Sequence, residues 1–545
     1  MQELTTVQFI NLLRERNIDV RAKEGRLQIN APAGAVDSQM RGELTRRKED
    51  LLSALQGAVA VQMQSSIAPE ERTGKIPQTD AQQGLWLIDY FDPGCVAYNI
   101  PVAYSAEGPF DTAALQTAVD QILVRHETLR TSFYEEDGDL FQRVESEATA
   151  RVELTDISHV SEADRDQALE TLIREQARRP FDLNHAPLVR FHLFRLAEQR
   201  HVVFFNIHHI VADGRSLAIL REELSALYQA AVQNQAAALP NLPIQYADYS
   251  LWAAKHLSDS RMQKQALYWQ TKLAALPAYL DLSDGRSYPQ KRTPWGDTTP
   301  VEIDASLRDS LKRIAQQEGA TMFMTLLAAF AVLLYRKCGT EDFCIGSPST
   351  LRTQVETESI IGLFVNMIVF RCDLSGEPSF RQVVQRIRTV ALEAYENSDL
   401  PFQELVRILK VDLRSLRSPF FQVMFGFDST EGEQPGSLIQ LDTKPGTARF
   451  DLTLQLTESA NGISGSFEYC TDLFDEPGMA ALSRRFVALL AELSANPDRS
   501  VSALEIPAIE NPQANASRSE SASSSFFRRL IRPLAAWSSR RSRPN

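Results

Sequence analysis

Three stretches of the chain show where the apolar residues concentrate and which elements they build. Residues 202–207 are apolar almost without interruption, which predicts a short buried strand. Leucines then recur at helical spacing over residues 214–233, so a helix follows the strand. Residues 322–335 form the longest apolar run. It is shorter than the about 20 residues of a membrane-spanning helix, and it therefore predicts a core helix.

The first part of the chain, residues 1–57, has a pattern of its own. Apolar residues at helical spacing precede two short runs, 19–23 and 26–30, which are separated only by Glu24-Gly25. This spacing predicts a tight β-hairpin. A second helix is predicted over about residues 38–56. A lone hairpin has an open strand edge, to which a strand of a partner can be added.

The rest of the chain divides into a linker, a long body and a tail. The linker covers residues 58–74, and the body covers residues 75–509 with alternating helical and strand patterns. Because the body exceeds the usual size of one domain, we expect an N-lobe (75–235) and a C-lobe (236–509). The tail covers residues 510–545, and from residue 511 onward it carries seven arginines and one acidic residue. It is expected to be a disordered basic segment, with an acidic partner or a membrane surface as alternatives.

Composition narrows the class of protein. The 545 residues are 43% apolar and 23% charged, which is typical of a globular protein. A net charge of −13 argues against a nucleic-acid-binding surface over the whole molecule. The five cysteines are scattered without a Cys-x-x-Cys pair, so we expect reduced thiols and no metal site. No signal peptide is visible, and a cytoplasmic protein not bound to a membrane is expected.

The strongest candidate for chemistry is the segment His-His-Ile-Val-Ala-Asp-Gly, from His208 to Gly214. It lies between the predicted strand and helix, where reactive groups are often exposed. Neighbouring residues of an extended chain point in opposite directions, so one histidine faces a cavity and the other packs inward. Asp213 would pair with a distant arginine, and the Gly214 amide would lie near a developing oxyanion. Packing and metal binding remain alternatives, although no third ligand has a suitable spacing.

This doublet is one of several segments that together resemble the condensation domain of nonribosomal peptide synthetases. The other matching segments are residues 80–86, 125–133, 246–252, 361–366, 399–402 and 418–422. The ordered set covers roughly residues 75–505 and is far more specific than the doublet alone.

The resemblance implies an α/β fold of two chloramphenicol-acetyltransferase-like lobes in a V, with the active site in a tunnel between them. His209 matches the catalytic histidine, which accepts or orients the proton of the attacking nucleophile. A base with a pKa near the working pH suits that task. His208 matches a supporting position. Asp213 matches the structural aspartate, Arg352 fits its salt-bridge partner, and Gly214 completes the motif.

Some positions depart from the family pattern. Arg215 stands where Trp or another apolar residue is common, at the tunnel rim. Arg414 and Arg417 do not both align with the seventh motif and receive no role. No histidine follows His256, which disfavours the epimerisation relatives. The intact doublet excludes the heterocyclisation relatives, which carry aspartates there.

Residues 1–57 resemble the N-terminal β-hairpin docking domains of synthetase subunits. Arg21, Lys23 and Arg26 on the hairpin would bind an acidic C-terminal peptide of an upstream acyl-carrier or peptidyl-carrier subunit. The alternative is that these charges stay solvated and prevent aggregation through the strand edge.

The segments that are missing complete the functional expectation. Neither an adenylation domain nor a Gly-Gly-x-Ser carrier segment is visible, which indicates a free-standing condensation enzyme without a cofactor of its own. The acyl donor is then a thioester on the phosphopantetheine of a separate carrier protein. We expect chain release onto a soluble amine or alcohol, forming an amide or ester. Alternatives are an acceptor on a second carrier, or a non-catalytic recruitment platform.

Overall fold

The computed structural model describes most of the chain. The described residues are 13, 18–23, 26–31, 38–48, 51, 66–72, 74–256, 260–276, 280–283, 288–289, 292–410, 420–429 and 439–504. The expected basic tail, Arg414 and Arg417 lie outside these residues. So does nearly all of the helix expected before the hairpin.

The N-terminal hairpin is present where the sequence predicts it. Strands β1 (Asp19–Lys23) and β2 (Arg26–Asn30) pair antiparallel, with Lys23 opposite Arg26. Helix α2 (Ser38–Arg46) follows, and residues 49–50 and 52–56 of the helix predicted over 38–56 lie outside the described residues. Arg21, Lys23 and Arg26 are therefore placed on the hairpin by their backbone, whereas their side chains lie outside the description.

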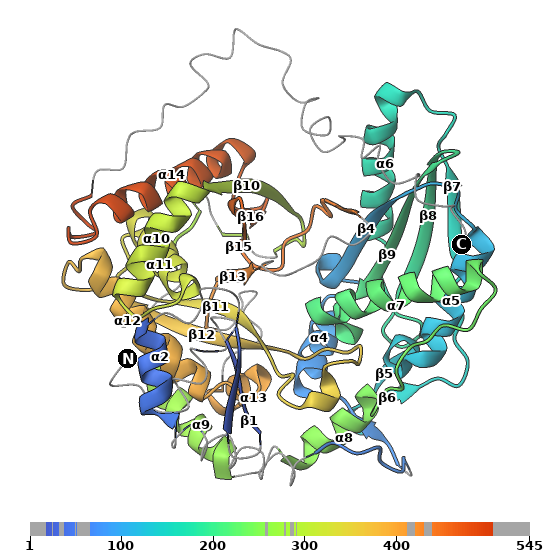
Figure 1. Ribbon diagram of the computed structural model, residues 1–545, viewed down its shortest axis with the longest axis horizontal. Helices are drawn as coiled ribbons and strands as arrows, with labels where there is room; N and C mark the ends of the chain where they lie inside the picture. The colour runs from blue at the N-terminus through green and yellow to red at the C-terminus, as the bar shows by residue number, and fades with distance from the viewer. Residues whose placement is uncertain are drawn as a thin grey trace, which may run out of the picture. The chain divides into compact units, whose positions relative to one another are not determined.

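A five-stranded sheet forms the centre of the N-lobe, in the order β14-β4-β9-β8-β7. The strands are β14 (Ile439–Leu441), β4 (Asn99–Glu107), β9 (Arg200–His208), β8 (Val189–Ala197) and β7 (Val152–Asp156). Helices α5 (Thr112–Arg125) and α7 (Gly214–Val232) lie side by side over one face, and α6 (Glu162–Ala177) covers the other (Figure 1). With both faces covered, β9 is buried throughout, which explains its uninterrupted apolar sequence.

Shorter elements complete this half of the body. They are β3 (Ile76–Pro77), α4 (Asp80–Phe91), η1 (Val96–Tyr98), η2 (Glu127–Arg130), β5 (Thr131–Glu136), β6 (Asp139–Val144), η3 (His209–Val211) and α8 (Tyr246–His256). Strands β3, β6 and β5 form a separate small sheet.

The C-lobe is built on a six-stranded sheet in the order β10-β16-β15-β13-β11-β12. Its strands are β10 (Gly296–Asp304), β11 (Asp342–Thr350), β12 (Val365–Asp373), β13 (Val423–Ser429), β15 (Leu452–Ser459) and β16 (Gly462–Cys470). Its helices are α9 (Ser260–Lys272), α10 (Ala305–Gln317), α11 (Met322–Cys338), η4 (Val355–Thr357), α12 (Phe380–Glu396), α13 (Phe402–Ile408) and α14 (Glu476–Ala495). This lobe contains the largest hydrophobic cluster of the described residues.

Helix α11 confirms the prediction of a core helix. Leu326, Ala328 and Phe330 are fully buried, as are most residues in its first three turns. Thr321 caps its beginning by accepting a hydrogen bond from the Met324 amide at 3.1 Å. Among the described residues, no single helix combines the length and apolar character needed to cross a bilayer.

One strand passes from the second half of the chain into the N-lobe. Leu441 of β14 pairs with Ala103 of β4, so residues 439–441 extend the N-lobe sheet before the chain returns to the C-lobe at β15. The hydrophobic pattern does not predict this three-residue strand. Its importance is that the segment after it passes close to the histidine doublet.

Candidate active site

The histidine doublet stands at the strand-to-helix turn that the sequence predicts. Strand β9 ends at His208, η3 begins at His209, and α7 begins at Gly214. Asp213 is the N-cap of α7, and its Oδ1 accepts the backbone N–H of Ser216 at 2.8 Å. Such a cap satisfies a helix N–H that has no partner within the helix, and it fixes where α7 starts.

His208 packs inward. Its side chain is buried, and its Nδ1 accepts the backbone N–H of Ile210 at 3.2 Å. The ring lies edge-on to Phe181, with 6.1 Å between the centroids. Burial lowers the pKa of His208 to about 3, and the neighbouring His209 lowers it further. A neutral, packed imidazole of this kind suits the supporting position that the sequence assigned to it.

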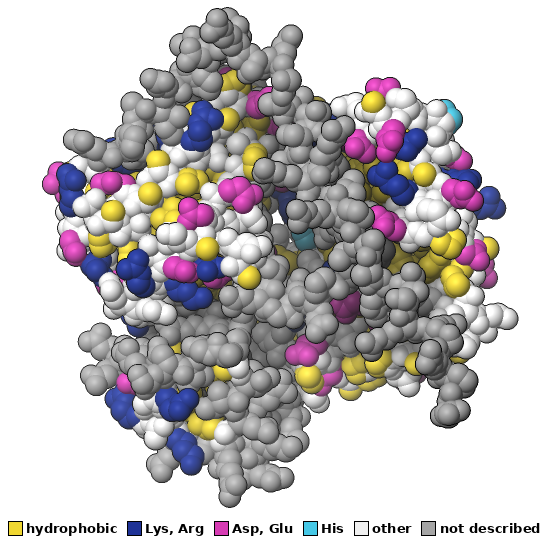
Figure 2. All heavy atoms as spheres, turned by 45° about the horizontal axis from the view of Figure 1, so that its top comes forward, with side chains coloured by type: hydrophobic (Ala, Val, Ile, Leu, Met, Phe, Trp, Pro, Cys, Tyr) yellow, Lys and Arg dark blue, Asp and Glu magenta, His cyan; other side chains and the backbone are white. Residues whose placement is uncertain are grey.

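His209 has one nitrogen engaged and one open. Its Nδ1 lies 2.7 Å from the carbonyl oxygen of Ala212. A carbonyl only accepts, so Nδ1 carries the proton and Nε2 carries the lone pair. Among the described residues, Nε2 has no hydrogen-bond partner. The side chain remains partly exposed. The space-filling view shows a hollow near the middle of one face of the molecule (Figure 2).

The basicity of His209 differs from the expectation of a base near its working pH. Burial and, to a smaller extent, the positive charge of Arg449 lower the pKa of His209 to about 4. The hydrogen bond to Ala212 and the charge of Asp213 act in the opposite direction but are weaker. His209 is therefore a neutral, weak base at physiological pH.

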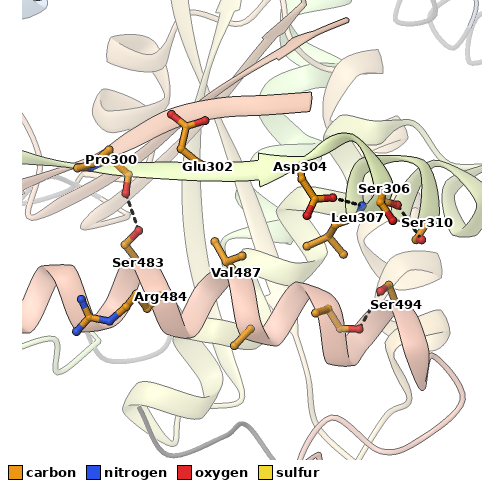
Figure 3. A pocket seen from close by; sticks show the side chains of 12 residues that line it. Pro300, Glu302, Asp304, Ser306, Leu307, Ser310, Ser483, Arg484, Val487 and Ser494 are labelled. Carbon is orange, nitrogen blue, oxygen red and sulfur yellow. Dashed lines mark hydrogen bonds between the residues drawn. The ribbon is translucent and has the colours of Figure 1, made fainter. Parts of the chain in front are cut away.

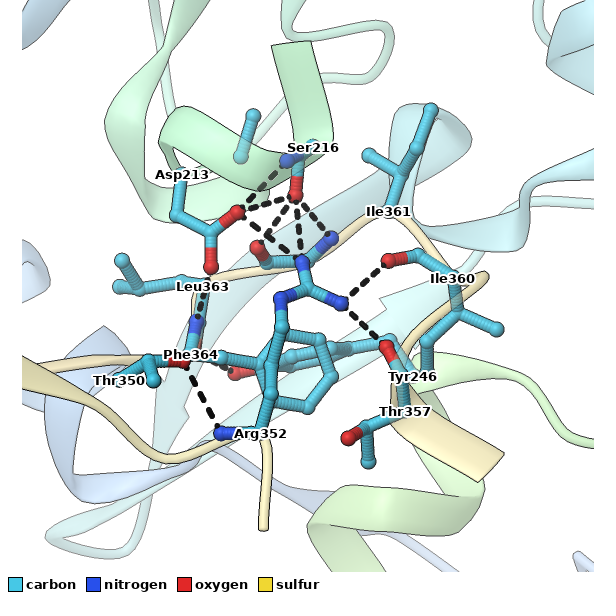
Figure 4. A network of polar contacts seen from close by, with 12 residues as sticks. Asp213, Ser216, Tyr246, Thr350, Arg352, Thr357, Ile360, Ile361, Leu363 and Phe364 are labelled. Carbon is cyan, nitrogen blue, oxygen red and sulfur yellow. Dashed lines mark hydrogen bonds and ion pairs between the residues drawn. The ribbon is translucent and has the colours of Figure 1, made fainter. Parts of the chain in front are cut away.

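Asp213 and Arg352 form the predicted ion pair (Figure 4). Asp213 Oδ1 accepts from Arg352 Nη2 at 3.0 Å, and its Oδ2 accepts the backbone N–H of Phe364 at 3.1 Å. The two side chains are only 3% and 6% exposed, respectively. A buried pair needs this additional bonding, because its charges have lost their water.

Both terminal nitrogens of the Arg352 guanidinium make further hydrogen bonds. Nη1 donates to the carbonyl oxygens of Ile360, at 2.9 Å, and Thr357. Its Nη2 also donates to the Ser216 hydroxyl at 2.9 Å, and the group stacks over the Phe364 ring, 4.1 Å from its centroid. Arginine can supply this fork and stacking, whereas a lysine ammonium cannot.

The loop 360–364 is fastened at further points (Figure 4). Ser216 Oγ accepts the Gly362 N–H at 3.0 Å, and the Tyr246 hydroxyl donates to the Leu363 carbonyl at 2.7 Å. Thr128 Oγ1 donates to the Ile361 carbonyl at 3.0 Å. A Cβ at Gly362 would come within 2.0 Å of the Tyr246 ring. We call Asp213, Ser216, Tyr246, Arg352 and residues 360–364 the clasp.

The clasp gives a structural role to several sequence segments. Thr128 belongs to segment 125–133, Tyr246 to segment 246–252, and Gly362 to segment 361–366. They hold the two lobes together beside the doublet. Ser216 was not identified from the sequence, and the only local signal is its position three residues after an N-cap aspartate.

Two other segments brace neighbouring parts. Gln82 of segment 80–86 donates from Nε2 to the Ile210 carbonyl at 3.4 Å, and so contacts η3. Asn366 donates to the carbonyls of Ser398 and Leu400, both at 2.9 Å, and accepts the Phe402 N–H. Segments 361–366 and 399–402 are thereby joined.

Gly214 is exposed and stands in open space. An added Cβ would meet no heavy atom within 4 Å. The packing of the free protein therefore does not require glycine here, and the predicted close approach would involve a bound substrate. Arg215 beside it is also exposed.

The volume of surface grooves does not identify the candidate active site. An open groove of about 730 Å³ lies between β10 and α14, with Glu302, Asp304 and Arg484 in its lining (Figure 3). Another, of about 1280 Å³, lies between α9 and α12. Neither is lined by a residue of the doublet or the clasp. Across the described ranges, no group of three or more His, Cys, Asp or Glu residues could hold a metal ion.

Comparisons with known proteins agree with this geometry. The family model of the condensation domain matches residues 72–514, and that of the TubC N-terminal docking domain matches residues 7–57. A linear gramicidin synthase chain of Brevibacillus parabrevis is 39% identical over 462 residues, 84% of this chain. Our chain spans only 9% of the length of that relative.

Solved structures show the same fold. The X-domain from teicoplanin biosynthesis has 28% identity and a TM-score of 0.75, covering 81% of this chain and all of that one. It has also been solved in complex with OxyB. The SgcC5 protein from Streptomyces globisporus, solved with a naphthyl ethanediol, has 26% identity and a TM-score of 0.65 over 78% of this chain and 100% of its own.

The predicted fold of two chloramphenicol-acetyltransferase-like lobes is thus confirmed, and the predicted family with it. The boundaries between linker, lobes and tail stay a prediction. With the condensation model matching most of its length and an intact histidine doublet at the turn, the chain belongs to the condensation-domain family of nonribosomal peptide synthetases, and it carries an N-terminal docking domain.

Proposed function

We propose that the protein transfers an acyl chain from a carrier-bound phosphopantetheine thioester to the amine or hydroxyl of a soluble acceptor. The observation that supports this most is the state of His209. Its Nδ1 is committed to the Ala212 carbonyl, so the open Nε2 can accept a proton from a nucleophile.

The reaction needs one proton acceptor and one proton donor. As the acceptor nitrogen or oxygen attacks the thioester carbonyl carbon, its proton moves to His209 Nε2. The tetrahedral intermediate then breaks its C–S bond, and the imidazolium returns the proton to the departing sulfur. The products are an amide or ester and a free phosphopantetheine thiol. Because the pKa of His209 is about 4, the proton moves only when attack is well advanced.

The clasp positions this base without contacting the reactants. Asp213 and Arg352 are buried and bonded to protein groups, so neither is available to a substrate. Their role is to hold the turn that carries His209 and Gly214. The Gly214 amide, on the exposed first residue of α7, remains the candidate for stabilising the oxyanion.

The donor is delivered by another protein in this proposal. Residues 7–57 match a docking-domain model, and β1 and β2 present a two-stranded sheet. Arg21, Lys23 and Arg26 would bind an acidic C-terminal peptide of the carrier protein. The chain itself then needs no cofactor. Deleting residues 1–57 should weaken carrier binding and leave turnover of a small thioester mimic unchanged.

Release onto a soluble acceptor is supported by a structural relative. SgcC5, which shares the fold, was solved with a small diol bound in its crystal. An acceptor held on a second carrier is the alternative for the same chemistry.

A recruitment platform is the second candidate function. It is favoured by the likeness to the X-domain of teicoplanin biosynthesis, which forms a complex with OxyB. A platform needs no catalytic base. This chain keeps both histidines, with His209 Nε2 available, and the hydrogen-bonded clasp beside them. We therefore favour catalysis.

The deciding experiment is intact-protein mass spectrometry of an acyl-loaded carrier with a panel of amines and alcohols. The His209→Ala variant should leave the carrier loaded while still binding it. His185→Ala is the matched control, because that histidine is 80% exposed and pairs only with Asp182. Equal unloading by wild type and His209→Ala would reject the catalytic proposal.

A further inference from the structure

Among the described residues, three polar groups of the region around the doublet have no hydrogen-bond or ion-pair partner. They are His209 Nε2, the Tyr98 hydroxyl and the guanidinium of Arg449. Within the described ranges, none of the three makes a side-chain hydrogen bond or ion pair. They come from η3, η1 and the segment between β14 and β15. Charged side chains that are partly buried without a partner are costly unless a ligand completes them.

Backbone pairing leads the chain of Arg449 toward the doublet. Leu441 pairs with Ala103 on β4, and Thr443 Oγ1 donates to the Pro101 carbonyl at 3.3 Å. Two residues before Pro101 on β4, Asn99 stands opposite His208 on β9. The segment thus runs along β4 toward the end of the strand pair where the doublet lies.

Arg178 fixes the next residues of this segment. Its Nε and Nη2 donate to the carbonyls of Pro445 and Gly446, at 3.1 and 3.2 Å. Arg178 follows the last residue of α6, Ala177, whose carbonyl accepts from Asn99 Nδ2 at 2.8 Å. Residues 445–446 therefore lie against the same helix end that contacts Asn99.

Both backbone polar groups of Arg449 are hydrogen-bonded to side chains, and these bonds do not involve its guanidinium. Its N–H donates to Glu468 Oε1 at 3.2 Å, and its carbonyl accepts from Arg292 Nη1 at 2.7 Å. Within the described part of the chain, Glu468 contacts the backbone of Arg449 and forms no ion pair with its guanidinium. Arg292 also donates to the carbonyls of Ala448 and Phe450.

The charge of Arg449 is felt by the other two groups. It lowers the pKa of His209 below what burial alone would give. Burial and, to a smaller extent, Cys95 raise the pKa of Tyr98 to about 12, while Arg449 acts in the opposite direction. Together with the course of the segment along β4, this places the charge of Arg449 within electrostatic reach of both other groups, and we infer that the three share one hollow.

We propose that Arg449 and the Tyr98 hydroxyl bind a carboxylate of the acceptor, so that the protein selects acceptors that are carboxylic acids. This rests on the proposed transfer to a soluble acceptor. A single guanidinium with one added donor matches the planar fork and single charge of a carboxylate. Binding would place the nucleophile of the same molecule next to His209 Nε2.

The carboxylate would also activate the base. In the free protein, the unneutralised charge of Arg449 disfavours protonation of His209. A bound carboxylate cancels that charge, so the pKa of His209 rises when the correct acceptor is present. Selection and activation then depend on the same arginine.

Matched acceptor pairs test the proposal. β-Alanine is compared with β-alaninamide, and 3-hydroxybutyrate with 3-hydroxybutyramide, each with the acyl-loaded carrier. Wild type should prefer the acids, and Arg449→Gln should lower kcat/KM for the acids by about 10- to 100-fold while changing it much less for the amides. Arg449→Lys should restore part of the preference, and Tyr98→Phe should reduce it less.

Arg195→Gln serves as the control, because Arg195 is 44% exposed and pairs with Asp156. An equal loss for acids and amides in Arg449→Gln would overturn the proposal and assign the arginine to the reacting oxyanion.

A second readout does not depend on turnover. In histidine-labelled protein, NMR should show that 3-hydroxybutyrate raises the pKa of His209 in wild type but not in Arg449→Gln. No response in wild type would overturn the carboxylate site. If this response is present while only carrier-bound acceptors are acylated, the soluble-acceptor function fails and the anion site stands.

Discussion

The clasp and the hollow beside it differ in how far their polar side chains are hydrogen-bonded within the protein. In the clasp, both Asp213 carboxylate oxygens and both terminal nitrogens of Arg352 are hydrogen-bonded, and the two side chains are almost fully buried. In the hollow, His209, Tyr98 and Arg449 keep groups without protein partners among the described residues. A saturated network holds two lobes in one geometry, whereas open groups are available for a substrate. This difference distinguishes residues that position the site, such as Asp213 and Arg352, from residues that can contact a substrate, such as His209.

The largest expected effect on stability comes from breaking the clasp. Arg352→Ala leaves the buried Asp213 carboxylate without its cation, which should lower the free energy of unfolding by about 3–5 kcal/mol. Urea denaturation measures this. The matched control is Arg195→Ala, whose Arg–Asp pair is exposed, with an expected loss of less than about 1 kcal/mol. Similar losses for the two variants would contradict the role of the clasp.

A smaller loss is expected from Gly362→Ala. The new methyl would lie 2.0 Å from the buried Tyr246 ring, so the loop 360–364 or the ring must shift. Overpacking of this kind costs about 1–3 kcal/mol. Thermal unfolding would show it, and an unchanged melting temperature would mean that the loop adapts freely.

Gly214→Ala should affect the hollow and spare the fold. Its Cβ meets nothing within 4 Å, so stability should stay within about 0.5 kcal/mol of wild type. If the Gly214 amide faces the reacting carbonyl, kcat should nevertheless fall. Full activity in this variant would remove the Gly214 amide from the proposed oxyanion site.

The pH dependence should show the smallest change. Because the pKa of His209 is lowered to about 4, the base stays neutral from pH 8 to 5, and kcat/KM should not fall through its protonation in that range. Removing the positive charge in Arg449→Gln favours the imidazolium, so the acid limb should move to higher pH. An acid limb near pH 6.5 in wild type would contradict the lowered pKa.

The sequence predicted the local parts of the site well. The apolar run before His208 became β9, the helical spacing after Gly214 became α7, and the hairpin residues paired as expected. These elements depend on short-range periodicity, which a single sequence displays directly. The Asp213–Arg352 pair came from the resemblance, since 139 residues separate the two.

The hollow was not predicted, and the reason is physical. Arg449 follows β14, which joins the N-lobe sheet, and a three-residue strand leaves almost no pattern in the sequence. Ser216 likewise bonds to Arg352 and Gly362, which are far away in the chain. The expectation of a base near neutral pH was wrong, since burial and the charge of Arg449 are properties of the folded protein.

The most direct measurement of the central claim is ¹⁵N NMR of the His209 ring in the full-length protein, titrated from pH 8 to 5. The account predicts a neutral imidazole with the proton on Nδ1 and a lone pair on Nε2 throughout this range. A proton on Nε2, or a titration midpoint near 6.5, would show that His209 is not the open, neutral base described for this site.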